Sequence, residues 1–355
     1  MALPSSTYDT ATLVNPGSSL TDFTLIVDLS RMSAAWWTAV DTSDGTKGRA
    51  AKDSGPTELA CDWIDFDSVN ETGWLRVKWS GTLASSGTQT LRVYPPQAAN
   101  ASVAASATYG SDNAYDSNWV LYLPFDGDAN DRTLYNNNAT ANGTPTYQAG
   151  KVGQETDLDG TVPEWFTVTT STELEPNGSM TFMVWAQSNA GLSNETISGR
   201  GIAPRNWQWY SSGSAQRILF RATDNTTVLA TGSATLTTLR HFAAVRDTSV
   251  SQIQLYANGA TDGSAVTDTT VGKTINTDAQ DVAIGDRYDV GSFPWNGTLD
   301  DFQMHDTARS ADWIEHEYEQ TNDQATFWGT WTNVPVAAGI SIPVVMHHRR
   351  MMGVS

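Results

Sequence analysis

Short apolar runs separated by turn residues recur along almost the whole chain, and this pattern constrains the fold more than any other feature. Clear examples occupy residues 23–27, 73–79, 180–185 and 252–256. In the second of these runs, Leu75 and Val77 point to one face and Arg76 to the other, as in a half-buried antiparallel strand. Asn-Gly pairs, which favour tight hairpin turns, lie beside several runs. The pattern predicts an all-β protein of the sandwich type.

The length of the chain indicates more than one domain. Its 355 residues are more than twice the ~150 of a typical domain, so we expect two domains, or else one large β-sandwich with an appendage. A pair of prolines and an Ala/Ser/Asn stretch interrupt the strand pattern between Pro95 and Ser117. We predict a small N-terminal β-sandwich over residues 1–109 and a second β domain over residues 110–335.

The last twenty residues, 336–355, form a predicted tail. Apolar residues are followed there by the basic stretch 347–350. The tail is either a frayed terminus or a docking arm that adds a strand to a neighbouring copy of the chain. In the second case, an acidic neighbouring copy would suit the basic stretch.

One segment has helical spacing, close to the end of the second domain. Ser310 can cap a helix there, and Ile314 and Tyr318 lie four residues apart on one face. Asp312 falls in the first turn, where the helix dipole favours an anion. We predict one short C-terminal helix over residues 310–318.

Net charge limits the partners of this chain. Twenty Lys and Arg against thirty-nine Asp and Glu give a net charge of −19, which disfavours nucleic acid and anionic membrane surfaces. No apolar stretch approaches the ~18 residues of a membrane span, so membrane insertion is not expected. Only 17% of residues are charged, so Ser, Thr, Asn and Gly must cover much of the surface, as is common in β-rich proteins.

Cysteine content and the first residues bear on location. The single cysteine, Cys61, cannot form an intramolecular disulfide, and we expect it to be a small buried residue. Residues 1–7 contain no basic region followed by an apolar one, so we expect no secretory signal peptide. The profile is that of a protein made in a cytoplasm and able to work outside one.

Several short segments give the second domain a familiar pattern. They are residues 123–131, 136–140, 150–153, 158–160, 180–185, 240–246, 255–259, 282–286 and 296–302. In order and spacing they resemble a LamG-like jellyroll domain of the concanavalin A-like lectin and glucanase superfamily, over about residues 119–318. The resemblance implies a two-sheet jellyroll closed by the helix, and carbohydrate binding as its commonest role.

The first domain also has a resemblance. Residues 20–30, 56–59, 72–77 and 107–113 are similar to a small domain of unknown function that often precedes such jellyrolls in predicted phage and secreted proteins. The chain departs from that pattern at Tyr94-Pro95-Pro96-Gln97, after the last strand. This departure affects the expected geometry of the domain edge. The domain pairing implies a virion protein.

Closely spaced acids suggest a calcium site. Asp126, Asp128 and Asp131 lie in one Gly/Asn-rich loop, and carboxylate oxygens are the ligands that calcium prefers. The resemblance implies that Asp300 lies near this loop and completes the site. The alternative is that these acids cap turns through side-chain hydrogen bonds.

Aromatic residues suggest where a glycan would bind. Trp295 lies between a proline and Asn296 in a predicted loop, and it is the best candidate for stacking on a sugar ring. Trp207 and Trp209 share one face of a predicted strand. That face either binds sugar or belongs to the core.

No catalytic pattern emerges from the sequence. The acids of Glu315-His316-Glu317-Tyr318-Glu319 echo a glucanase motif, but that motif works on a strand, where a period of two aligns the acids. On the predicted helix we expect a solvated surface instead. His241, His305 and His316 have no partners at ligand or triad spacing, and we expect structural roles for them.

The leading hypothesis is therefore a non-enzymatic structural protein of a tailed-phage virion. It would be a tail-fibre, spike or capsid-decorating subunit, made in the host cytoplasm. It would contact other virion proteins and copies of itself in a homo-oligomer, and display the jellyroll for host-surface glycan attachment or particle stabilisation. The alternatives are a non-viral carbohydrate-binding or adhesion protein and, third, a glycoside hydrolase.

Overall fold

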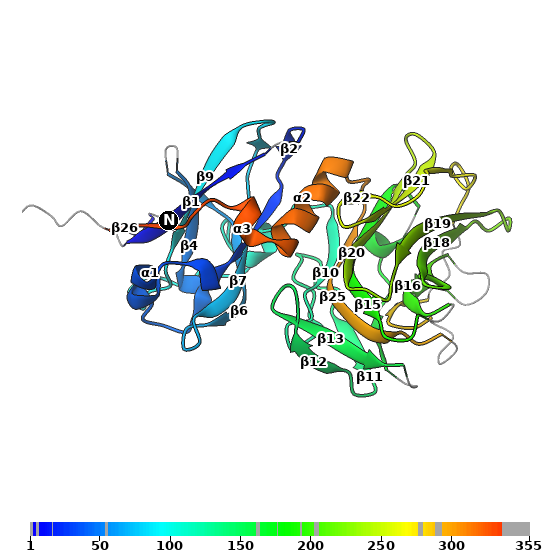
Figure 1. Cartoon of the computed structure of the whole chain (residues 1–355), viewed down its shortest axis with the longest axis horizontal. Coiled ribbons are helices and arrows are strands. Elements are labelled where there is room, and N and C mark those ends of the chain that lie inside the picture. The colour runs from blue at the N-terminus through cyan, green and yellow to red at the C-terminus, as the bar shows by residue number, and fades with distance from the viewer. Residues whose placement is uncertain are drawn as a thin grey trace, which may run out of the picture.

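Two β-rich domains lie side by side in the computed structural model, with helix α2 (Ala311–Asn322) between them (Figure 1). The structure describes residues 3–4, 7–15, 17–53, 56–160, 164–175, 177–191, 194–201, 206–275, 280–287 and 293–335. The predicted tail lies outside them. The prediction of an all-β sandwich protein with a C-terminal helix is confirmed, and the helix begins after Ser310 as predicted but runs four residues further than Tyr318.

The first domain packs a five-stranded antiparallel sheet, in the order β26-β1-β9-β4-β5, against a three-stranded sheet in the order β3-β7-β6. The strands of the first sheet are Thr332–Val334, Tyr8–Val14, Thr88–Tyr94, Arg49–Lys52 and Thr57–Leu59. Those of the second are Thr24–Asp28, Thr72–Lys78 and Cys61–Asp67. The short pair β2 (Leu20–Thr21) and β8 (Thr82–Leu83) and helix α1 (Ala34–Ala39) complete the domain.

The second domain is a two-sheet jellyroll, with a core of apolar side chains between the sheets. One sheet has the order β12-β13-β25-β15-β20-β21-β22, with β10 and β23 paired beside it. Its strands are Thr146–Ala149, Gln154–Asp159, Asn296–His305, Met180–Ser188, Arg240–Asp247, Gln252–Ala257, Ala260–Thr261, Trp119–Leu123 and Val266–Thr267.

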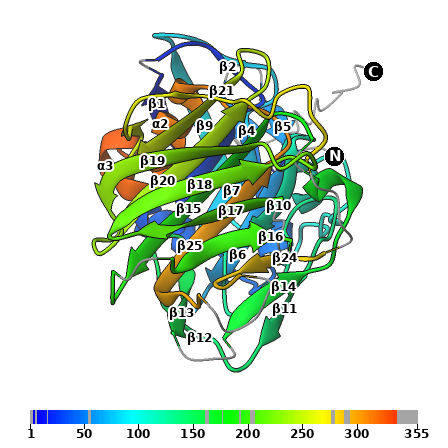
Figure 2. The ribbon, with the colours of Figure 1, turned by 90° about the vertical axis from the view of Figure 1, so that its right-hand side faces the viewer.

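The other sheet of the jellyroll lies on the side away from the first domain (Figure 2). Its order is β11-β14-β24-β16-β17-β18-β19. The strands are Ala139–Asn142, Trp165–Val168, Val282–Ile284, Thr196–Arg200, Trp207–Ser212, Ala215–Arg221 and Thr227–Thr235.

The end of the described chain returns to the first domain. After α2, helix α3 (Gln324–Phe327) leads to β26, which pairs with β1. The sequence analysis assigned residues up to 335 to the second domain, but this strand belongs to the first domain's sheet. The first domain is therefore completed by residues that follow the jellyroll.

Two glutamines cover the open edge of β3. Gln320 accepts a hydrogen bond from the Ile26 N–H and donates one to the Thr24 carbonyl, at 2.8 and 3.1 Å. Gln324 repeats the arrangement at the Asp28 N–H and the Ile26 carbonyl. Gln320 lies in the last turn of α2 and Gln324 begins α3, and together their amides take the place of a neighbouring strand.

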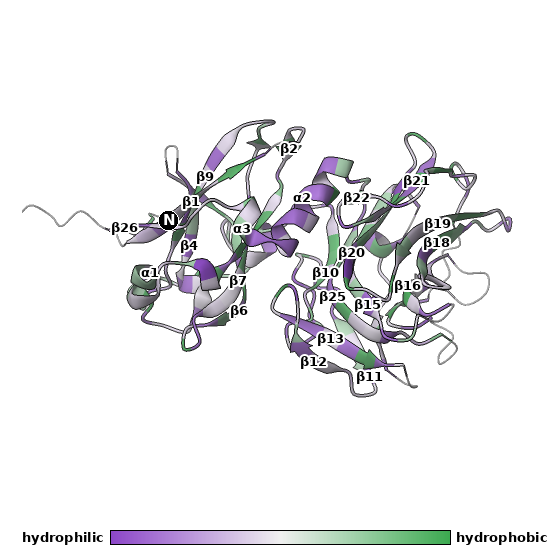
Figure 3. Ribbon diagram, in the orientation of Figure 1, coloured by the Kyte–Doolittle hydropathy of each residue, from purple (hydrophilic) through white to green (hydrophobic). Residues whose placement is uncertain are grey.

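A buried ion-pair cluster connects the domains. Arg76 of β7 donates to Glu317 of α2 at 2.5 Å and to Asp301 of β25 at 2.7 Å, and all three side chains are fully buried. Gln303 donates to both acids. Burial alone would lower the pKa of Arg76, but Asp301 and Glu317 outweigh it and raise that pKa. Glu317 is thus not on a solvated helix face, contrary to the sequence-based expectation. Most of α2 is hydrophilic (Figure 3), and some of its polar side chains, such as Glu317 and Gln320, are buried at the junction.

A bulge in β25 supplies the second acid of the cluster. The register of β25 against β15 shifts between residues 183 and 185, and Asp301 has a φ of +55°. Because the bulge adds one residue, Asp300 and Asp301 both leave the jellyroll core, which continues at Leu299 and Phe302. A left-handed backbone at a non-glycine residue is strained, and the Arg76 ion pair offsets that strain.

We expect Arg76→Met to lower the free energy of unfolding by about 3–5 kcal/mol, because two carboxylates would remain buried without their cation. Urea unfolding followed by fluorescence measures this change. Lys273→Met is the control, since its exposed pair with Asp224 contributes at most about 1 kcal/mol. Equal stability of R76M and wild type would contradict the role assigned to the cluster.

Candidate ligand-binding hollow at the domain junction

The tryptophans predicted to stack on sugar are buried in the jellyroll core. Trp207 and Trp209 are 0% exposed and pack on Phe182 of the facing sheet. Trp295 is also 0% exposed, and its backbone N–H donates to the Gly285 carbonyl. The predicted exposed platform at Trp295 is therefore wrong, because the loop folds back and carries the ring inward. Asn296 stays partly exposed, but its side chain accepts a hydrogen bond from Asn189.

The four predicted calcium ligands do not converge on one point. Asp131 is buried, and its two oxygens accept hydrogen bonds from the backbone of Tyr122, Thr133 and Asn137. Burial raises its pKa, although these bonds oppose the rise. A carboxylate surrounded by N–H donors organises its own loop and has little capacity left for a cation.

Asp126 and Asp300 approach different residues of the turn formed by residues 150–153, namely Gly153 and Gly150. One oxygen of Asp300 accepts from the Lys151 and Val152 N–H groups. Asp126 accepts from Arg132 and from the Asp65 N–H of the first domain, at 3.0 and 3.1 Å. Burial, followed by the charge of Asp65, raises the pKa of Asp126 to about 6. Within the described residues, no three His, Cys, Asp or Glu side chains are placed to hold a metal, so these acids do not fit a calcium cage.

Asp128 and Asp131 instead line an open hollow, which we call the asparagine hollow. Its other polar lining residues are Ser111, Asp112, Asn130, Arg132, Thr133, Asn136 and Asn138. The hollow has a volume of about 290 Å³, close to the lower end of the range for small-molecule sites. It lies where the segment joining the domains, residues 95–118, meets the loop after β10.

Local turns present the amides of the asparagine hollow to solvent. Asp128 accepts a hydrogen bond from the Asn130 N–H, forming a side-chain-capped turn. Asn136 has a φ of +54°, and the side-chain amide oxygen of Asn138 accepts a hydrogen bond from the Asp131 N–H. Asn130, Asn136 and Asn138 are all exposed. Amide, carboxylate and guanidinium groups in one hollow can donate to and accept from the neighbouring hydroxyls of a sugar.

Sequence reasoning noticed this loop for its acids rather than for its amides. The run of three asparagines was used only for the family resemblance, although exposed amides are themselves a ligand-binding signal. Asp112 was missed altogether, because its approach to the hollow depends on how the joining segment crosses the loop.

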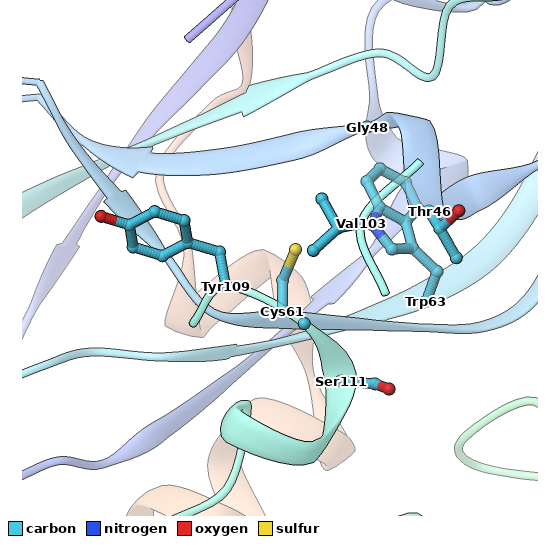
Figure 4. Close-up of a pocket in the computed structure, with 8 residues that line it drawn as sticks. Thr46, Gly48, Cys61, Trp63, Val103, Tyr109 and Ser111 are labelled. Carbon is cyan, nitrogen blue, oxygen red and sulfur yellow. The ribbon is translucent and has the colours of Figure 1, made fainter. Parts of the chain in front are cut away.

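A second cavity, around Cys61, is too small for a ligand. Gly48, Trp63, Val103 and Tyr109 line it with Cys61, and its volume is about 40 Å³, which is room for a few water molecules. Figure 4 shows the Cys61 sulfur pointing toward Val103. Burial, followed by the charge of Asp62, raises the pKa of the thiol to about 12. Cys61 is thus an inert core residue.

The remaining candidates for chemistry have structural contacts. His316 contacts the Asp312 carbonyl and Asn15, and His305 contacts Gln303 and Arg309. His241 is buried against Trp185 and Tyr318, and burial lowers its pKa to about 4. Of the three glutamates on α2, Glu317 is paired with Arg76. These positions do not form a pair of acids facing a cleft.

The second domain is similar to a known protein family. Residues 164–315 match the family model of the concanavalin A-like lectin/glucanases superfamily. The second domain thus has a jellyroll fold and is similar to this superfamily over most of its length. No curated protein matches the chain. None of the helices in the described part has the length and apolar character needed to cross a membrane.

Three solved binding domains share limited similarity with the chain. The binding domain of Paraclostridial Mosquitocidal Protein 1 has a TM-score of 0.47 and 13% identity, over 57% of this chain and 52% of that one. The receptor-binding domain of botulinum neurotoxin C/D mosaic serotype has a TM-score of 0.49 and 12% identity, over 57% of this chain and 51% of that one. The binding domain of botulinum neurotoxin DC, solved with rat synaptotagmin II, has a TM-score of 0.49 and 12% identity, over 58% of this chain and 52% of that one. The matched region spans about half the length of those chains.

Trp295→Ala tests the burial of that ring. We expect a loss of about 3–5 kcal/mol in unfolding free energy, because a large core side chain leaves a cavity. Chemical denaturation measures the loss. A variant that unfolds like wild type but loses glycan binding would show that the ring is an exposed platform after all.

Cys61 should resist alkylation in the folded protein. Iodoacetamide at pH 8 should leave the thiol intact for hours, since it is buried and protonated, and should modify it rapidly in 6 M urea. Mass spectrometry distinguishes the two states. Fast labelling without denaturant would mean that the cavity opens readily to solvent.

Proposed function

We propose that this chain is a non-catalytic carbohydrate-binding protein of a tailed-phage virion, which attaches the particle to a glycan surface. The observation that carries the binding function is the asparagine hollow, a set of solvent-facing amides and acids beside a jellyroll of a lectin-containing superfamily. The absence of an acid pair facing a cleft among the candidate residues supports a binding role over hydrolysis.

The chemistry of the asparagine hollow suits neutral sugar hydroxyls. In the described structure, the Asp112 carboxylate and the Asn138 amide nitrogen make no side-chain hydrogen bond, so both are available to a ligand. Asp128 and Asn130 bind each other and hold the rim in place. A site with free groups on a fixed frame loses little entropy when it binds.

The virion role rests on the sequence and on the low share of charged residues, which leaves much of the surface to neutral polar side chains. Only 17% of residues are charged, and a β-sandwich stabilised by a buried ion-pair cluster does not depend on disulfides. The proposal includes a homo-oligomer and contacts with other virion proteins. Immunogold imaging of purified virions, together with light scattering of the isolated protein, tests it; a monomer absent from the particles would contradict it.

Glycan binding is tested with an array of bacterial surface glycans, followed by calorimetry on the best neutral ligand. We expect the double variant Asp112→Ala, Asn138→Ala to bind at least tenfold more weakly, because two hydrogen-bonding groups to the sugar are lost. Asn177→Ala, at an exposed turn position that does not line the hollow, is the matched control. No glycan binding by wild type, or equal binding by the double variant, would overturn the assignment.

A further inference from the structure

Lys78 emerges beside the buried ion-pair cluster. It lies two residues after Arg76 in β7, so the two side chains share a face of the strand. Arg76 is sealed between the domains, whereas Lys78 reaches the edge of the junction and is partly exposed. Two open hollows, of about 460 and 380 Å³, meet at this lysine, and both are lined by Lys78 and Asn113. We call them together the lysine groove.

We propose that the lysine groove binds an acidic saccharide, with a sugar carboxylate at Lys78. This inference rests on the proposed carbohydrate-binding function and names a second site and a ligand class for it. The groove lies on the other side of the joining segment from the asparagine hollow: Asn113 faces the groove, and Ser111 and Asp112 face the hollow.

Lys78 has no acidic partner of its own. Within the described residues it forms no ion pair, and its ammonium has one long contact, 3.4 Å, to the Tyr115 carbonyl. Lys52 approaches the same place, donating to the Ser80 carbonyl at 2.5 Å, and Ser80 lines the groove. On a chain of net charge −19, an anionic ligand needs such a local pair of cations.

The acids near the lysine groove are already engaged. Asp116 accepts a hydrogen bond from Arg309 at 2.7 Å and another from the Asn118 N–H. Asp22 accepts from the Gly81 N–H at 2.6 Å. Because Arg309 balances Asp116 and the charge of Asp22 offsets that of Lys52, the positive charge left to attract a ligand is that of a single lysine.

The remaining lining of the lysine groove suits a sugar. Asn118 and Asn113 supply amides, and Tyr109 is a partly exposed ring that can pack on a sugar face. The combined size of the two hollows falls within the range of natural ligand sites. A carboxylate on Lys78 with hydroxyls bound by the two amides uses the lysine, Asn113 and Asn118 of the groove.

Calorimetry with three probes tests the proposal on the full chain: trigalacturonate, a trimer of α-linked sialic acid, and neutral trigalactose. We expect wild type to bind at least one acidic probe more tightly than the neutral one, with an affinity that falls as salt rises. Lys78→Gln should weaken that binding about tenfold, because a charge-assisted hydrogen bond is lost. Lys273→Gln, at an exposed lysine paired with Asp224, is the matched control and should bind like wild type.

Unchanged melting temperature of K78Q confirms that folding is intact. The proposal is overturned if neither acidic probe binds wild type, or if K78Q binds as wild type does. If K78Q does not fold, Lys52→Gln replaces it, and we expect a smaller but measurable loss of affinity for the acidic probe. Neutral-glycan binding that depends on Asp112 and Asn138, without any acidic binding, would leave the proposed function standing and remove this inference alone.

Discussion

Everything at the junction depends on one buried cation. Arg76 carries the positive charge that allows Asp301 and Glu317 to be fully buried, and these acids come from the jellyroll sheet and the closing helix. A buried charge without its partner is strongly destabilising, so the first domain cannot leave the second without exposing or stranding the cluster. The ion pairs therefore fix the relative position of the domains rather than simply adding stability.

That fixed position gives the molecule its candidate binding surfaces. The segment joining the domains crosses the junction in one path, with the asparagine hollow on one side and the lysine groove on the other. The groove takes lining residues from both domains and from the joining segment. Helix α2 contributes to the same arrangement, since Gln320 covers the edge of β3 while Glu317 reaches Arg76.

The sequence was sufficient for what depends on local pattern. Alternation and Asn-Gly turns predicted the sheets, and Ser310 predicted the start of the helix. It was not sufficient where contacts between residues distant in the sequence determine whether a side chain is buried. Trp295 has the neighbours of a loop residue, but the loop folds onto the core. Glu317 lies on a polar helix face that would be solvated in a single domain, and only the second domain makes it a buried partner of Arg76.

Differential scanning calorimetry of the full chain tests most directly the central claim, that the two domains form one unit held at Arg76. The account predicts a single transition, with the calorimetric enthalpy equal to the van't Hoff enthalpy. Two separate transitions in wild type, one for each domain, would contradict it. They would show that the junction, and the hollows that depend on it, are not a fixed part of the structure.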